Sequence, residues 1–238
     1  MSEQRISAAI GLACAIFLGQ AVALQAAGTV SISTVAPTTN LIEFFDSTQT
    51  TTSTNWAVRR IEDIVGSTGS QCVGQTFQHE TAFQIKALTV QVGSTGRDFT
   101  VGPAGTQILQ IGFGEDTNAD GTPDTLFGAV ETFDMRPFNV AALDFITFTF
   151  PSALPQMQAG KTYGFYIWFT NIDANHILLL RRSNIVSQTN YPKGGYILDT
   201  TLVFPPLGTA PGGGTGLNHD GYFFLQSEPS GVGDWKAF

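Results

Sequence analysis

The densest group of chemically useful side chains lies in the stretch EDTNADGTPD, residues 115 to 124. Its pattern is D-x-N-x-D-G-x-x-D, with oxygen-bearing side chains at alternate positions before a glycine. Oxygens spaced in this way in a tight loop can converge on one hard cation, and glycine permits the sharp turn. We therefore predict a structural calcium site, with the ligands Asp116, Asn118, Asp120, the carbonyl group of Thr122, and Asp124.

This stretch resembles the calcium loops of EF-hand, dockerin and thrombospondin type 3 proteins. It departs from the EF-hand at the twelfth position, where Phe127 replaces the bidentate glutamate, so a modest affinity is implied. The alternative is the ion-free tip of a β-hairpin, because Asp120-Gly121 is a strong turn signal. Repulsion between neighbouring carboxylates favours the ion, since at about 4 Å it is roughly 1 kcal/mol per pair even in bulk water.

A second candidate site lies in the aromatic stretch TYGFYIWF. On a strand, Tyr166 and Trp168 would share the face opposite the other rings. Exposed rings of this kind stack on the C–H faces of sugars, so we predict a carbohydrate-binding surface at these two residues. His219 and Asp220, in the long loop 204–221, are further ligand candidates. The alternative is that this loop covers both rings, because large aromatic side chains are buried on average.

Signatures of catalysis are missing from the sequence. The chain contains no G-x-S-x-G, H-E-x-x-H or Walker motif, and its three histidines are scattered. We therefore expect no catalytic residues. A polysaccharide-degrading enzyme is kept as an alternative, because carboxylates such as Glu131 and Asp134 could form an acid/base pair in a groove.

The elements expected to position these side chains are β-strands. Charged residues make up 13% of the chain, and residues 146–150 (ITFTF) alternate as in a strand with one buried face. Many short apolar stretches are separated by turn signals such as Gly93–Gly96. This pattern predicts an all-β fold, an antiparallel β-sandwich with jelly-roll topology. One short helix is expected at residues 56–65.

Four segments are expected along the chain. An apolar stretch at residues 6–23 follows Arg5 and ends in small residues, which is typical of an export signal. An uncleaved membrane anchor is the alternative, because about 18 apolar residues are at the short limit for spanning a bilayer. The predicted segments are a signal peptide at 1–26, an N-terminal extension or edge strands at 27–69, a β-sandwich domain at 70–228 and a C-terminal tail at 229–238.

Charge and cysteine content narrow the possible partners and compartment. The net charge of −8 and the lack of a basic cluster oppose binding to nucleic acid. Cys72 is the one cysteine outside the predicted leader, so no internal disulfide is expected and a buried thiol is favoured. We expect a secreted, extracellular protein that meets a membrane only through its leader if the leader is uncleaved.

A series of motifs runs from about residue 70 to residue 228: GQTFQ, FQIKALTVQVG, the D-G-T-P loop, FTFPSALPQMQAGKTYGFYIWF, YPKGGY and GYFFLQSEP. Their order resembles the secreted bacterial β-sandwich domains of the choice-of-anchor type, which often carry PEP-CTERM sorting tails. The resemblance implies a surface or matrix protein. Sorting by such a tail is not expected, because no membrane segment or basic end follows Glu228.

The expected function is therefore that of a secreted, non-catalytic module, stabilised by calcium, that binds carbohydrate or takes part in a cell-surface matrix. One alternative is a self-assembling extracellular structural subunit of a filament or matrix. In that case the N-terminal segment would add as a strand to the sheet edge of a neighbour. The other alternative is the polysaccharide-degrading enzyme.

Overall fold

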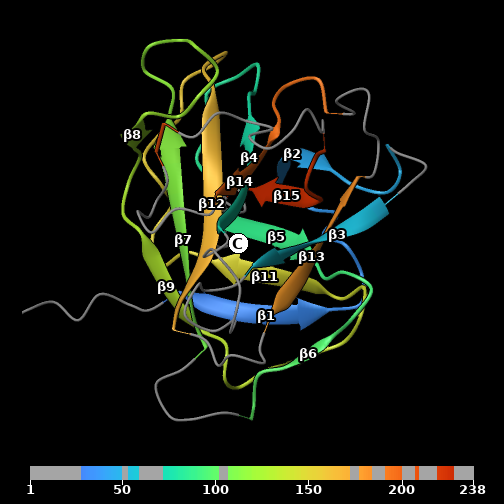
Figure 1. Ribbon diagram of the computed structural model, residues 1–238. Helices are drawn as coiled ribbons and strands as arrows, with labels where there is room; N and C mark the ends of the chain where they lie inside the picture. The colour runs from blue at the N-terminus through green and yellow to red at the C-terminus, as the bar shows by residue number, and fades with distance from the viewer. Residues whose placement is uncertain are drawn as a thin grey trace, which may run out of the picture.

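The computed structural model describes residues 28–49, 53–58, 72–101, 107–171, 177–183, 191–199, 207–208 and 219–227. Within these ranges the chain forms fifteen β-strands and no helix (Figure 1). Accordingly, no described segment is a helix long and apolar enough to cross a bilayer. The predicted leader at 1–26 and tail at 229–238 lie outside the described residues.

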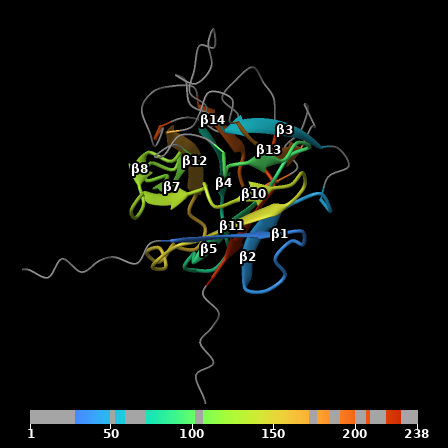
Figure 2. The ribbon, with the colours of Figure 1, turned by 90° about the horizontal axis from the view of Figure 1, so that it is seen from below.

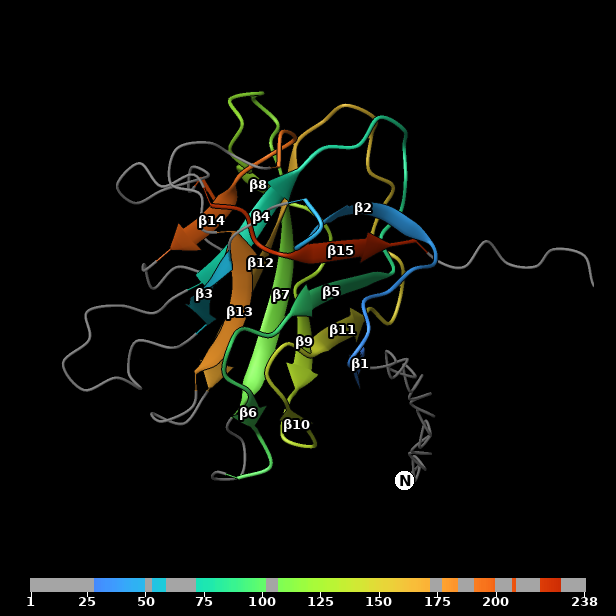
Figure 3. The ribbon, with the colours of Figure 1, turned by 90° about the vertical axis from the view of Figure 1, so that its right-hand side faces the viewer.

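One layer of the fold is a five-stranded antiparallel sheet. Figure 3 shows its strands stacked in the order β2, β15, β5, β11, β1. The two edge strands, β1 and β2, both come from the first 45 residues of the chain. The bounds in sheet order are β1 (Thr29–Ser33), β11 (Phe145–Thr149), β5 (Ala87–Gln91), β15 (Phe223–Gln226) and β2 (Leu41–Phe45).

The second layer is a six-stranded antiparallel sheet in the order β14-β4-β12-β7-β8, in which β9 also pairs with β7. Its longest strand, β12, lies between β4 and β7 and pairs with both along most of its length. The bounds are β14 (Tyr196–Asp199), β4 (Cys72–Phe77), β12 (Tyr163–Asn171), β7 (Ile108–Glu115), β8 (Thr125–Leu126) and β9 (Glu131–Asp134).

Two short ribbons complete the fold: β3 (Ser53–Val58) pairs with β13 (Leu178–Ser183), and β6 (Arg97–Asp98) pairs with β10 (Asn139–Val140).

The helix expected at residues 56–65 is wrong over its first part. Trp56 and Val58 are buried on alternate positions of β3, a period of two rather than 3.6. Residues 59–65 lie outside the described residues.

The core lies between the two sheets, which form separate layers when viewed from below (Figure 2). Rings from opposite layers touch at its centre: Phe165 of β12 and Phe223 of β15 have ring centroids 5.5 Å apart. Alternate residues of each strand supply this interior, as a sandwich requires. The predicted all-β antiparallel sandwich is confirmed. The strand order does not establish the jelly-roll topology, which stays a prediction.

Candidate functional site

The acidic loop connects β7 to β8 at one end of the six-stranded sheet. Asp116 is buried, and its two carboxylate oxygens accept backbone N–H groups, Oδ1 from Asp120 at 3.2 Å and Oδ2 from Gly121 at 2.7 Å. Asn118 Oδ1 accepts the same Asp120 N–H at 3.1 Å. Two of the predicted calcium ligands therefore converge on one backbone nitrogen, which closes the turn.

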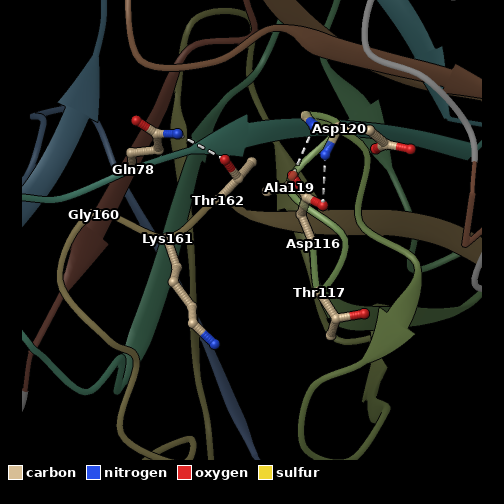
Figure 4. Close-up of a pocket in the computed structure, with 9 residues that line it drawn as sticks. Gln78, Asp116, Thr117, Ala119, Asp120, Gly160, Lys161 and Thr162 are labelled. Atoms are coloured by element: carbon tan, nitrogen blue, oxygen red, sulfur yellow. Dashed lines mark hydrogen bonds between the residues drawn. The ribbon is translucent and has the colours of Figure 1, made fainter.

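The other two predicted carboxylate ligands, Asp120 and Asp124, make different contacts. Figure 4 shows the carboxylate of Asp120 turned away from that of Asp116, and its Oδ1 accepts the N–H of Thr122 at 2.8 Å. Asp124 Oδ1 accepts the hydroxyl of Thr117 at 2.7 Å, and this bond lowers the pKa of Asp124 below its usual value. Within the described residues, no group of three or more acidic, histidine or cysteine side chains is placed to hold a metal ion. The calcium site stays a prediction.

A hollow of about 410 Å³ lies between this loop and the turn that precedes β12. Across it, the N–H of Asp116 donates to the carbonyl of Thr162 at 3.0 Å, and Gln78 Nε2 donates to Thr162 Oγ1 at 2.7 Å. Lys161 Nζ donates to Glu115 Oε1 at 2.6 Å, which raises the pKa of Lys161. These bonds join three segments that are distant in sequence, and Figure 4 shows the bond between Gln78 and Thr162.

A second hollow of about 180 Å³ shares Gln78 and Gly160 with the first, and the two together are called the polar groove. Two residues that line the second hollow contact the buried carboxylate of Glu43 on β2: Lys193 Nζ lies 2.8 Å and His79 Nδ1 3.3 Å from its Oε2. The side chains and backbone lining the groove come from Gln78, His79, Glu80, Asp116, Thr117, Ala119, Asp120, Gly121, Gly160, Lys161, Thr162 and Lys193.

Sequence reasoning missed this groove. The sequence pattern indicates the acidic side of the groove. It gives no sign that Lys161 and Gln78 join that side, because each belongs to a different strand connection. The A-G-K-T-Y motif was a possible signal, since a lysine directly after a turn glycine is well placed to reach a neighbouring loop.

The two rings of the predicted aromatic binding surface are buried in this structure. Tyr166 is 0% and Trp168 is 3% exposed. The two rings do face away from the main core, but they pack with Cys72 and Ile197 in a second apolar cluster. Leu207 of the loop 204–221 packs against that cluster together with Val130, so the loop contributes to its cover, as the alternative proposed. Large apolar rings gain more from this cover than from exposure to water.

His219 and Asp220 are also buried, and both serve the fold. Asp220 Oδ1 accepts Gln75 Nε2 at 3.1 Å, and Oδ2 accepts the N–H of Tyr191 at 3.0 Å. His219 Nδ1 lies 3.0 Å from the carbonyl oxygen of Ser183, a contact in which Nδ1 donates. The structure therefore does not bring this pair together with Tyr166 and Trp168 at a shared surface.

The carboxylates considered for an enzyme, Glu131 and Asp134, both lie on β9. Asp134 forms an ion pair with Arg136, whose hydrogen bonds lower the pKa of the carboxyl group. Burial raises the pKa of Glu131. The Asp134 carboxylate is thus already engaged by a cation within its own turn.

Comparisons of the chain with protein-family models, with curated proteins and with solved structures found no match.

Proposed function

We propose that this chain is a secreted, non-catalytic β-sandwich module of a cell surface or extracellular matrix, and that it binds carbohydrate in the polar groove. The observation that carries the proposal is the lining of the groove. Its larger hollow of about 410 Å³ is bordered by amide, hydroxyl, carboxylate and ammonium side chains. That volume lies within the range of small-ligand sites, which is roughly 300 to 1,000 Å³.

The chemistry of the lining suits a polyhydroxylated ligand. A sugar hydroxyl both donates and accepts hydrogen bonds, so it can use cationic donors and amide or carboxylate acceptors side by side. An ammonium group carries three donors, and Glu115 takes one of those of Lys161. The hydroxyl of Thr162 accepts from Gln78 and can donate its own hydrogen toward the hollow.

The hydrogen bonds of the buried Asp116 carboxylate favour a binding role of the groove over a catalytic one. Both oxygens of Asp116 hold backbone N–H groups of its own loop. A general base must instead accept a proton from a bound substrate. Asp116 therefore supports the shape of the groove.

A calcium ion bracing residues 115–124 belongs to the same proposal. Its support is the residue pattern and the convergence of Asp116 Oδ1 and Asn118 Oδ1 near one nitrogen. Side-chain oxygens at the first and third positions of such a loop are calcium ligands. The carboxylate of Asp120 would have to turn inward to join them.

Binding to a glycan array and to insoluble polysaccharides, measured with intact protein, tests the carbohydrate proposal. We expect retention on at least one glycan, and loss of retention in Lys161→Met and Gln78→Ala. Lys86→Met is the matched control, because Lys86 Nζ bonds the carbonyl of Pro151 and lies outside the groove lining. Uniformly negative arrays, or equal losses in the control, would remove carbohydrate binding from the proposal.

The second candidate function is the self-assembling extracellular subunit. The observation that favours it is the position of the N-terminal strand β1 at the edge of the five-stranded sheet. This candidate does not depend on the polar groove, so the two can be tested separately.

A further inference from the structure

Strand β1 forms one edge of the five-stranded sheet, next to β11 (Figure 3). Its sequence, TVSIS, has no charged residue and no proline, and its pairing with β11 runs without a break in register. Edge strands usually carry a charge, a proline or a bulge that prevents pairing with another chain. The other edge strands of at least four residues in the two main sheets do carry acidic residues: Glu43 on β2, Asp199 on β14, and Glu131 on β9.

The direction of the free backbone groups on β1 follows from the sheet register. The N–H of Phe150 donates to the carbonyl of Lys86, so even-numbered residues of the β11 segment direct their backbone groups to the β5 side. Odd-numbered residues of β11 then face β1, since successive residues of a strand point their backbone groups to opposite sides. Ser31 lies opposite Thr147. The odd-numbered residues of β1 therefore bond β11, and its even-numbered residues direct N–H and C=O groups outward.

The outward-facing backbone groups in β1 are those of Val30 and Ile32. The side chains of these two residues are half-buried and pack against the core. The side chains of Thr29, Ser31 and Ser33 are exposed. The strand thus offers four backbone groups along its edge, an apolar inner face and a hydroxyl-bearing outer face.

We propose that β1 pairs with β1 of a second copy of this chain, antiparallel about a two-fold axis at Ser31. Val30 then lies opposite Ile32 of the second copy, in both halves of the interface. Each such pair exchanges two N–H···O bonds, which satisfies every outward-facing group of the strand. The two five-stranded sheets join into one continuous sheet, with apolar side chains matched on the inner face and hydroxyls on the outer face.

The same register favours a second copy of this chain as the partner of β1. A two-fold axis perpendicular to the sheet at Ser31 makes the two strands antiparallel and keeps both apolar faces on the same side, so each copy presents the pattern that the other needs. The absence of charge on β1 matters because each copy carries a net charge of −8. Two copies repel at long range, so the dimer should strengthen with added salt. This interface closes at two copies, so it gives a dimer and not the filament of the second candidate function, and it is independent of carbohydrate binding in the polar groove.

Sedimentation of the full chain across a concentration series tests the proposal. We expect a dimer that dissociates on dilution. We expect Ser31→Lys, which places two cations directly across the axis, to raise the dimer dissociation constant about two- to fivefold. Ser31 is exposed, so the variant should keep the circular dichroism spectrum of the parent. A monomer at every concentration, or a dimer unaffected by Ser31→Lys, overturns the proposal.

Cysteine substitution provides a second test that does not depend on weakening the dimer. Residues facing each other in a non-hydrogen-bonded pair have Cα atoms about 4.5 Å apart, which is within disulfide range. Ser31→Cys should therefore form a covalent dimer on mild oxidation. Ser33→Cys is the matched control, because position 33 would face Thr29 of the second copy. Equal crosslinking of both variants, or none above the parent chain, contradicts the two-fold register.

Discussion

The ammonium group of Lys161 lies 2.6 Å from a carboxylate oxygen of Glu115, and this contact joins the turn before β12 to the end of β7. The Lys161 side chain is 42% exposed, so the solvent screens the pair and its contribution to stability is small. We expect only a small coupling between the two positions in a double-mutant cycle of Lys161→Met and Glu115→Gln, measured by urea unfolding, and we expect added salt to reduce it further. A large coupling that salt does not reduce would assign the pair to the fold rather than to the groove.

Strands β4 and β12 approach so closely at Gly74 that one added methyl group there should strongly lower the free energy of unfolding. A Cβ atom added to Gly74 would lie 2.0 Å from the carbonyl oxygen of Phe165, a backbone atom that cannot move without disturbing the ladder. We expect Gly74→Ala to lower the free energy of unfolding by about 3 kcal/mol or more. Gly112→Ala is the control, because its Cβ would meet the Trp168 ring at 3.3 Å and the side chain can yield. Equal losses in the two variants would contradict this account.

Burial of Trp168 in the second apolar cluster gives the residue a role in stability. Trp168→Ala should cost about 3 to 5 kcal/mol of unfolding free energy, the usual range for a large buried ring. The exposed Leu126 is the control, and Leu126→Ala should change stability by less than about 0.5 kcal/mol. If Trp168→Ala were instead nearly neutral for stability and abolished glycan retention, the aromatic surface would be restored as the binding site.

The strands with clear alternation could be predicted from sequence alone. In ITFTF, Ile146 and Phe148 are buried while Thr147 and Thr149 are half-buried, as the period of two requires. The helix expected from residue 56 failed for a reason outside the local sequence. Trp56 pairs with Leu180, far along the chain, and that partner decides the strand. Local spacing of apolar residues cannot reveal such a distant pairing.

In the candidate site, too, local sequence reveals the local contacts but not the distant ones. The turn at Asp116 was visible in the sequence because its bonds are local, spanning four and five residues. The bonds that form the rest of the groove join residues far apart in sequence, 46 positions from Glu115 to Lys161 and 150 positions from Glu43 to Lys193. Alternation also indicated which face Tyr166 occupies, but the segment covering that face comes from another part of the chain.

His219 should make the stability of the fold depend on pH. Burial and the nearby Arg182 cation lower its pKa below the ordinary value of 6.5, so the folded state holds the ring neutral. The unfolded state binds the proton more readily, and stability is therefore lost as the pH falls below about 6.5. His219→Gln should reduce this slope of unfolding free energy between about pH 7 and pH 5. An unchanged slope in the variant would assign the acid sensitivity to other groups.

Calcium should stabilise the protein through the loop between β7 and β8. At a concentration about tenfold above its dissociation constant, the ion would add about 1.4 kcal/mol. Asp120→Asn gives the sharpest comparison, because the change removes one negative charge of the loop and replaces a carboxylate ligand by a neutral amide oxygen. In a chelator the variant should melt at a higher temperature than the parent, since carboxylate repulsion is relieved. In millimolar calcium the parent should be the more stable, since its carboxylate binds the cation more strongly than a neutral amide oxygen does. If calcium does not reverse the order of the two melting temperatures, or does not change that of the parent, the loop is an ion-free hairpin held by the bonds from backbone N–H groups to Asp116.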